Sequence, residues 1–182
     1  MFPKAHATAY VTSAFRIAWF KVHMPIYYYA AYFSIRCDQF DVATMIKGED
    51  AIRNKIDELE EKKSMGKTSN KEDAICDVLY VCLEMTARGF YFSNIDLEKS
   101  QSNKFVVTED KLGLIIPFSA MDGLGGIAAS KIVEERNKKS YISIKDLKER
   151  GKVPEKIVNE LISLGTLKDL PESNQLSIFN FI

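Results

Sequence analysis

The chain has 182 residues, of which 46% are hydrophobic and 27% charged, and this composition is that of an ordinary globular protein. Lysine plus arginine and aspartate plus glutamate each number 25, so the formal net charge is zero. Whole-chain attraction to nucleic acid is thereby excluded, and only local charge could provide it. The three cysteines are too scattered for a disulfide framework. The two histidines are not at metal-ligand spacing, so no metal site is predicted.

Residues 1–36 are predicted to form two helices that are rich in aromatic side chains. Phe15, Trp19 and Phe20 recur at helical spacing, and Pro25 falls near the start of the second helix. Charged residues and Pro25 interrupt the apolar stretch 9–33, so no membrane span is expected. Because so dense an aromatic surface is hard to keep soluble alone, we expect it to pack on residues outside this chain.

The middle of the chain changes from helical to strand periodicity. Residues 49–64 have the pattern of an amphipathic helix. Asn70 with Asp73 resembles a capping box for the next helix, which stops near Gly89. Three strand-like segments follow, at 90–92, 104–108 and 112–116. The predicted fold class is therefore mainly α with a small antiparallel β element (α+β), and short helices return at about 126–137, 143–150 and 154–164.

Residues 122–136 read D-G-L-G-G-I-A-A-S-K-I-V-E-E-R and resemble the helix-hairpin-helix motif, in which a G-hydrophobic-G turn joins two short helices. Gly123 and Gly125 are expected to adopt positive φ and to let a ligand approach the backbone. Leu124 is expected to point between the helices. Free N–H groups around Gly125 and Gly126 would then form a phosphate site at a helix N-terminus. A plain glycine-rich connection is the alternative.

Local charge supports binding to DNA in this region. Nine basic and five acidic residues lie from Lys131 to Lys156, a local excess of four. A second, degenerate hairpin follows, in which Ser143 caps a helix that ends at the G-K-V turn of residues 151–153. Lys131 and Lys152 are predicted DNA contacts, and Lys152 is the candidate for a direct phosphate contact. Such contacts position a protein on DNA without reading its sequence. For Lys152, a solvated surface lysine is the alternative.

Residues 175–179 read Q-L-S-I-F. This segment is similar to the short motif by which bacterial polymerases and repair proteins dock on the ring-shaped sliding clamp, with a consensus close to Q-L-x-L-F. In that mode Gln175 hydrogen-bonds at the pocket rim, and Leu176, Ile178 and Phe179 are apolar anchors. A tail that becomes ordered on binding loses conformational entropy, so its affinity should be modest. A C-terminal strand packed on its own domain is the alternative.

Three segments resemble the C-terminal part of PolC-type replicative DNA polymerases (DNA polymerase III alpha subunit) of low-GC Gram-positive bacteria. They are M-F-P-K-A-H-A-T-A-Y, F-R-I-A-W-F-K-V-H-M-P-I-Y-Y-Y-A-A-Y-F-S-I-R and L-P-E-S-N-Q-L-S-I-F. The hairpin lies where that family has its hairpin domain, and the order of the segments agrees. The resemblance implies four regions: fingers-type helices (1–89), a small β element (90–116), a tandem helix-hairpin-helix region that binds duplex DNA (117–170), and a flexible clamp-binding tail (171–182).

The resemblance also implies what the chain lacks. In the whole polymerase, two magnesium ions held by palm aspartates support template-directed synthesis. Those aspartates lie upstream, so no catalytic residue and no cofactor are expected here, and the chain alone should be inactive. Met1 matches an internal methionine of the family pattern, so the chain is expected to begin inside the fingers. Lys4 and His6 would face the triphosphate of the incoming nucleotide; an exposed terminal lysine is the alternative for Lys4.

The partners implied are duplex or primer-template DNA, the sliding clamp (beta subunit) and the upstream polymerase domains, in the cytoplasm and without membrane contact. Three rival interpretations stay open. A base-excision glycosylase would need a catalytic aspartate downstream of the hairpin, where Asp146 lies in surroundings that do not match. A stand-alone DNA- and clamp-binding accessory protein would use only the hairpin and the tail. A purely structural helical protein would use neither.

Overall fold

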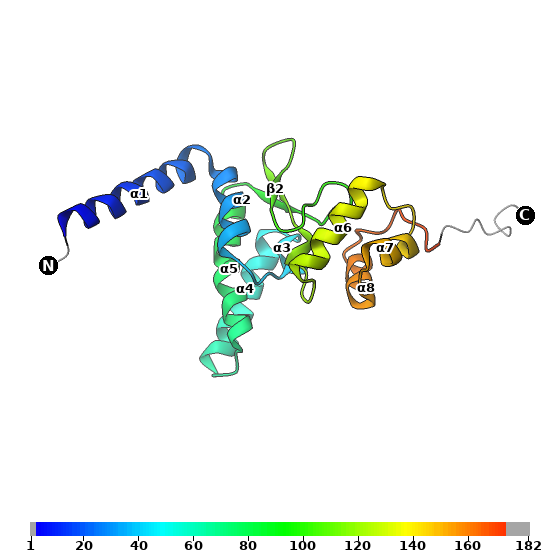
Figure 1. Cartoon of the computed structure of the whole chain (residues 1–182). Coiled ribbons are helices and arrows are strands. Elements are labelled where there is room, and N and C mark those ends of the chain that lie inside the picture. Colours follow the sequence, from blue (N-terminus) through cyan, green and yellow to red (C-terminus); the bar gives the residue numbers. More distant parts are fainter. Residues whose placement is uncertain (1–2, 174–182) are drawn as a thin grey trace, which may run out of the picture.

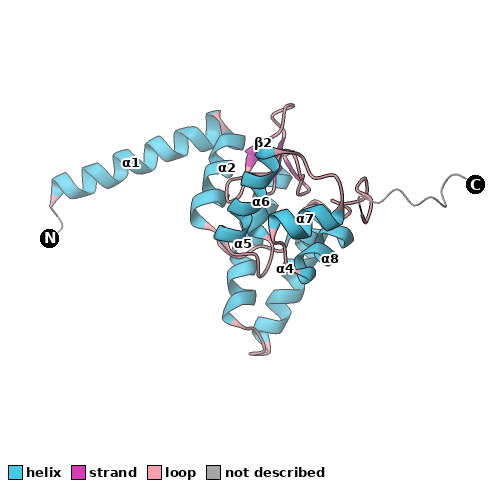
Figure 2. Ribbon diagram, turned by 45° about the vertical axis from the view of Figure 1, so that its right-hand side comes forward, coloured by secondary structure: helices cyan, strands magenta, loops and turns pink. Residues whose placement is uncertain are grey.

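The computed structural model describes residues 3–173, most of which are helical (Figure 1, Figure 2). The predicted class, mainly α with a small β element, is therefore confirmed. The elements are α1 (Lys4–His23), α2 (Pro25–Arg36), α3 (Val42–Met45), α4 (Glu49–Ser64), α5 (Asn70–Ala87), β1 (Tyr91–Ser93), β2 (Val106–Val107), β3 (Gly113–Ile115), the 3-10 turn η1 (Phe118–Ala120), α6 (Gly126–Lys138), α7 (Ile144–Gly151) and α8 (Glu155–Ser163).

The three strands form one sheet in the order β1-β3-β2. The β2 and β3 strands are antiparallel, with Val107 opposite Leu114, as the sequence predicted. The β1 strand, however, runs parallel to β3, with Phe92 opposite Leu114, so a purely antiparallel element was wrong. A long segment that contains β2 connects β1 to β3, and β3 lies between the other two strands. A connection of this length allows β1 and β3 to run in the same direction.

Helices α4 and α5 form an antiparallel pair. Ile52, Ile56 and Leu59 are buried on one face of α4, as the amphipathic pattern of residues 49–64 predicted. The α5 helix begins with a capping box in which the Ser69 hydroxyl accepts from the Glu72 N–H and the Glu72 carboxylate accepts from the Ser69 N–H. The predicted box of Asn70 and Asp73 was therefore one residue too late.

One hydrophobic core runs through the described residues from α2 to the C-terminal helices. The Phe33 ring is fully buried, 5.3 Å from the Phe92 ring and 5.5 Å from the Phe105 ring. The same cluster continues through Leu147 of α7 and Leu161 of α8. Because one set of apolar contacts holds α2, the sheet and the last helices together, these elements are stabilised as a unit.

Helix α1 projects away from this core (Figure 1) and none of its residues is buried. Its aromatic side chains face solvent; Phe15, for example, is 72% exposed. Only its C-terminal end is held to α5, where the Lys21 ammonium group lies 2.8 Å from the Glu84 carboxylate and Arg88 donates to the Lys21 carbonyl. Among the described residues, no helix has both the length and the apolar character needed to cross a membrane.

The end of the described chain is attached to α7. The carbonyl oxygen of Pro171 accepts from the N–H of Ile144 at 2.9 Å, and that of Glu172 accepts from the N–H of Lys145 at 3.0 Å. These bonds satisfy two N–H groups of the first turn of α7, which have no intrahelical partner. Residues 171 and 172 thus complete the N-terminus of this helix.

Candidate nucleic-acid interface

The G-L-G loop joins η1 to α6. Gly123 has φ +88°, in the left-handed region that favours glycine. Gly125 has φ −64° and ψ 155°, an ordinary extended conformation, so the expectation of positive φ at both glycines was wrong for Gly125. Leu124 is buried between the surrounding elements, as predicted, and its N–H donates to the Met121 carbonyl at 3.1 Å.

The N-terminus of α6 is open to solvent. Its first backbone bond runs from the Ala129 N–H to the Gly125 carbonyl, and no side chain caps the helix. The N–H groups of Gly126, Ile127 and Ala128 therefore lack an acceptor within residues 3–173. A Cβ added at Gly125 or Gly126 would meet nothing within 4 Å. The loop thus leaves room for a ligand atom directly at the backbone, and the helix dipole favours an anion there.

The second hairpin is the turn that joins helix α7 to helix α8. Lys152 has φ +50°, a left-handed conformation. The neighbouring Gly151 is packed so tightly that an added Cβ would lie 3.0 Å from the Tyr141 hydroxyl oxygen. Ser143 caps α7 through its hydroxyl, which accepts from the Asp146 N–H, as predicted. The hairpin closest to the consensus sequence thus has only a 3-10 turn before it, whereas the degenerate one lies between two α-helices.

Several of the predicted basic residues carry compensated charge. The Lys131 ammonium group lies 2.8 Å from the Glu135 carboxylate, which Lys138 also contacts at 2.8 Å. The hydrogen bond from Lys131, followed by that from Lys138, lowers the pKa of Glu135 to about 2. Lys152, by contrast, is exposed and has no carboxylate partner within the described part of the chain. Of the two predicted lysine contacts, Lys152 is therefore the one whose charge no carboxylate of the described residues compensates.

Arg136 contributes structure rather than surface charge. Its guanidinium group is buried and donates to the carbonyl oxygens of Leu97 at 3.0 Å and Ser100 at 2.6 Å. These bonds tie α6 to the segment after β1. Arg150 is similarly engaged, with Asp146 at 2.9 Å. Arg136 and Asp146 are the buried charged residues of this range, one of each sign, so the local excess of four positive charges counted in the sequence remains at the surface.

The remaining predicted residues lie elsewhere. Lys4 and His6 are in the first turn of α1, whose N-terminal end points away from α6, α7 and α8 (Figure 1), so the structure does not bring them to the hairpins. The predicted clamp-binding residues Gln175, Leu176, Ile178 and Phe179 lie outside the described residues. Within residues 3–173, no three His, Cys, Asp or Glu side chains gather into a group that could hold a metal ion.

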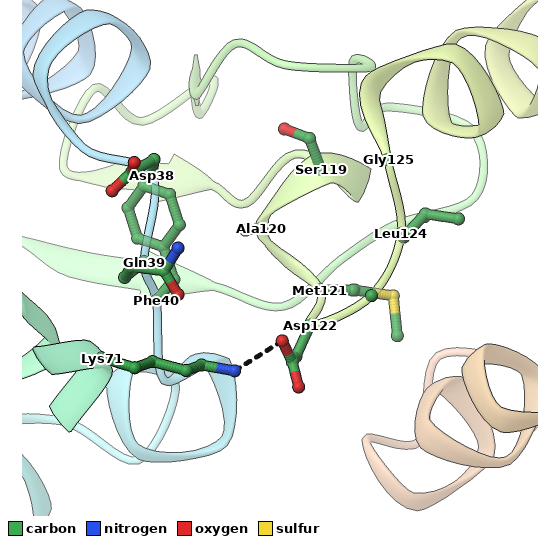
Figure 3. Close-up of a pocket in the computed structure, with 11 residues that line it drawn as sticks. Asp38, Gln39, Phe40, Lys71, Ser119, Ala120, Met121, Asp122, Leu124 and Gly125 are labelled. Atoms are coloured by element: carbon green, nitrogen blue, oxygen red, sulfur yellow. Dashed lines mark hydrogen bonds and ion pairs between the residues drawn. The ribbon is translucent and has the colours of Figure 1, made fainter. Parts of the chain in front are cut away.

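A hollow of about 380 Å³ borders the first hairpin and includes residues that the sequence did not indicate. Figure 3 shows Asp38, Gln39 and Phe40 on one side and the loop residues on the other, with Lys71 reaching across to Asp122. The ammonium group of Lys71 lies 2.6 Å from the Asp122 carboxylate. This hydrogen bond is the main cause of a lowered pKa at Asp122. Because the two residues lie far apart in the chain, no local pattern could have paired them.

Comparison with known families agrees with this geometry. Residues 89–176 match the family described as "Helix-hairpin-helix motif". This range contains the G-L-G loop, α6, the second hairpin and the short sheet before them. The folded chain thus carries a helix-hairpin-helix region.

Similarity to known proteins extends over nearly the whole chain. It is 48% identical over 179 residues to DNA polymerase III PolC-type of Halalkalibacterium halodurans and 46% identical over 180 residues to that of Streptococcus sanguinis. The matches cover 98% and 99% of this chain but 12% of each relative. The chain is therefore a homologue of one segment of PolC-type DNA polymerase III. The resemblance inferred from its sequence is confirmed.

Proposed function

We propose that this chain is the part of a PolC-type replicative polymerase that holds duplex or primer-template DNA through its phosphate backbone, without sequence preference. The observation that carries the proposal is the uncapped N-terminus of α6 beside the G-L-G loop, where backbone N–H groups and open space coincide. Lys152 adds a free ammonium group at the second hairpin. In this arrangement the two hairpins hold the backbones of the two strands.

Gly125→Ala tests this proposal. Because Gly125 has φ −64° and an added Cβ meets nothing within 4 Å, alanine should leave the fold intact. The methyl group would stand where a phosphate must approach, and loss of a charge-assisted hydrogen bond worth about 1.5–3 kcal/mol predicts roughly tenfold or greater weakening. Fluorescence anisotropy with a labelled duplex, over a series of salt concentrations, measures the affinity.

Gly89→Ala is the matched control. Gly89 has φ +86° and lies after α5, away from both hairpins, with open space around it. Alanine there strains the backbone and should lower the free energy of unfolding by about 1 kcal/mol, yet leave the affinity for DNA unchanged. If Gly125→Ala bound as tightly as the unmodified chain, or if the affinity did not fall as salt rises, the DNA-binding proposal would be wrong.

We further propose that Gln175, Leu176, Ile178 and Phe179 dock on the sliding clamp. The support is their similarity to the Q-L-x-L-F consensus, together with the homology of the chain to a polymerase. Deleting Gln175 to Ile182 should abolish binding to the purified clamp in surface plasmon resonance while leaving the affinity for duplex DNA unchanged. Phe179→Ala alone should weaken clamp binding by removing its largest apolar anchor. Clamp binding that survives the deletion would refute this assignment.

The nucleotidyl transfer of the polymerase, and the magnesium ions that it uses, are assigned in this proposal to parts of the relatives that the chain does not span. Lys4 and His6 are proposed to face the nucleotide only when those parts are present. The upstream domains are likewise proposed to cover the exposed aromatic side chains of α1. An independent accessory protein, which would use the same hairpins and tail, is the second candidate. It predicts a native chain of this size rather than a much longer one.

A further inference from the structure

Two lysines from different helices converge on the residue that precedes the G-L-G loop. Lys71 is in the first turn of α5, and Lys156 is in the first turn of α8. Their ammonium nitrogens lie 2.6 Å and 3.5 Å, respectively, from the carboxylate oxygens of Asp122. Lys156 also donates to the backbone carbonyl of Asp122 at 3.4 Å. Two helices distant in sequence thus place two positive charges at the loop.

The positions of these ammonium groups relative to the loop are specific. The Lys156 nitrogen lies 3.7 Å from where a Cβ of Gly123 would stand, so it is in contact range of the loop backbone. Lys71 lines the same hollow as Gly125 (Figure 3). Both side chains are well exposed, at 48% for Lys71 and 68% for Lys156. Both ammonium groups therefore border the loop that leads into the free N–H groups of α6.

The ion pairs of Lys71 and Lys156 with Asp122 are weak enough for a phosphate to replace the carboxylate. Exposed ion pairs contribute only about 0–1 kcal/mol because water screens them. A phosphate bound at the α6 N-terminus accepts hydrogen bonds from an ammonium group as well as the Asp122 carboxylate does. The negative charge of Asp122 would also repel that phosphate. Glu160 of α8 lies close enough for the charges of Lys156, Asp122 and Lys71 to act on its pKa, which burial raises. The two lysines thus offset the negative charge of Asp122 beside the loop.

We propose that Lys71 and Lys156 are further contacts to the DNA backbone and that Asp122 holds both ammonium groups at the first hairpin until a phosphate replaces it. This inference rests on the proposed DNA binding. It extends the interface from the two hairpins to α5, which precedes the sheet. The bound strand then continues over the hollow between residues 38–40 and the loop.

The test measures the affinity of the 182-residue chain for a short labelled duplex as salt is raised, for Lys71→Gln, Lys156→Gln and Asp122→Asn. Each lysine variant should bind more weakly at every salt concentration. The slope of log affinity against log salt should fall by about 0.9 for each phosphate that the variant no longer neutralises. Asp122→Asn should bind severalfold more tightly, since it removes a competing negative charge and frees both lysines.

Lys99→Gln is the control. Lys99 is equally exposed and ion-paired, with Glu109 at 3.3 Å, but it lies in the segment that Arg136 holds at the C-terminal end of α6. It should leave the slope unchanged. If Gly125→Ala weakens binding but neither lysine variant changes the slope, the proposal for α5 and α8 is overturned while the hairpin function stands. Weaker binding by Asp122→Asn would also overturn it, because Asp122 would then be supporting the loop rather than competing with phosphate.

Discussion

Lys152 combines a charge with a strained backbone at the turn of the second hairpin. A left-handed conformation costs a residue other than glycine about 1–2 kcal/mol, and Lys152 adopts it with φ +50°. In an ordinary surface turn, glycine would be the better residue at this position. The lysine at this position therefore costs stability that a glycine would not, which favours a role for its side chain. A free ammonium group at a turn between two short helices is well placed to bind a phosphate.

Lys152→Gly separates the two properties. Glycine fits φ +50° without strain, so the free energy of unfolding should stay unchanged or rise by up to about 1 kcal/mol, after allowance for the greater freedom of the unfolded chain. The affinity for duplex DNA should nevertheless fall, and the salt slope should fall by about 0.9. Urea unfolding and fluorescence anisotropy measure the two effects.

Lys111→Gly is the control for this prediction. Lys111 also has positive φ, at 60°, and is exposed in the turn before β3, away from the hairpins. The substitution removes the same charge from the same backbone conformation. It should leave DNA binding unchanged. An equal loss of affinity in both variants would mean that overall charge, rather than a contact at Lys152, determines binding.

At the scale of elements, α7 depends on residues that come after the last helix. The N–H groups of Ile144 and Lys145 are satisfied by the carbonyls of Pro171 and Glu172. A chain that ends at Leu170 should lose about 1–2 kcal/mol in free energy of unfolding relative to one that ends at Ser173, because two N–H groups of the first turn would be left without acceptors. Equal urea midpoints for the two truncations would contradict this account.

Much of the element order could be predicted from the spacing of apolar residues and from residues, such as proline, that start or end helices. The apolar spacing of Ile52, Ile56 and Leu59 predicted α4 with its observed bounds of residues 49 to 64, and Pro25 correctly marked the start of α2. The capping box was misplaced by one residue because two overlapping pairs fit the same pattern. The parallel pairing of β1 was missed because a period of two identifies a strand but not its neighbour.

The candidate site was predictable only where its residues are close in sequence. The G-L-G loop was found because glycine spacing and the following helix carry a local signal. Lys71 was not found, since its partner Asp122 lies in another part of the chain and only folding brings them together. Arg136 was counted as surface charge because a basic residue in a helix does not reveal its burial. Sequence patterns thus identified the loop but not the charges around it.

At the scale of the whole molecule, α1 is an apolar helix without a core of its own. It has no buried residue, and a surface so rich in exposed aromatic side chains favours association. The 182-residue chain should therefore self-associate as its concentration rises. A chain that starts at Met24 should stay monomeric, with a thermal midpoint close to that of the full chain. Sedimentation velocity and calorimetry measure these outcomes. A full chain that stays monomeric at high concentration would contradict this expectation.

The continuous core described above has a mechanical consequence. The aromatic cluster around Phe33 and the guanidinium bonds of Arg136 join α2, the sheet and α6, so the described residues between α2 and the hairpins pack as one unit. Tension on a DNA strand held at the G-L-G loop would be transmitted through packed side chains to α2 and the base of α1, rather than absorbed by a hinge. The hairpins and the N-terminal helices would then move together as one rigid body.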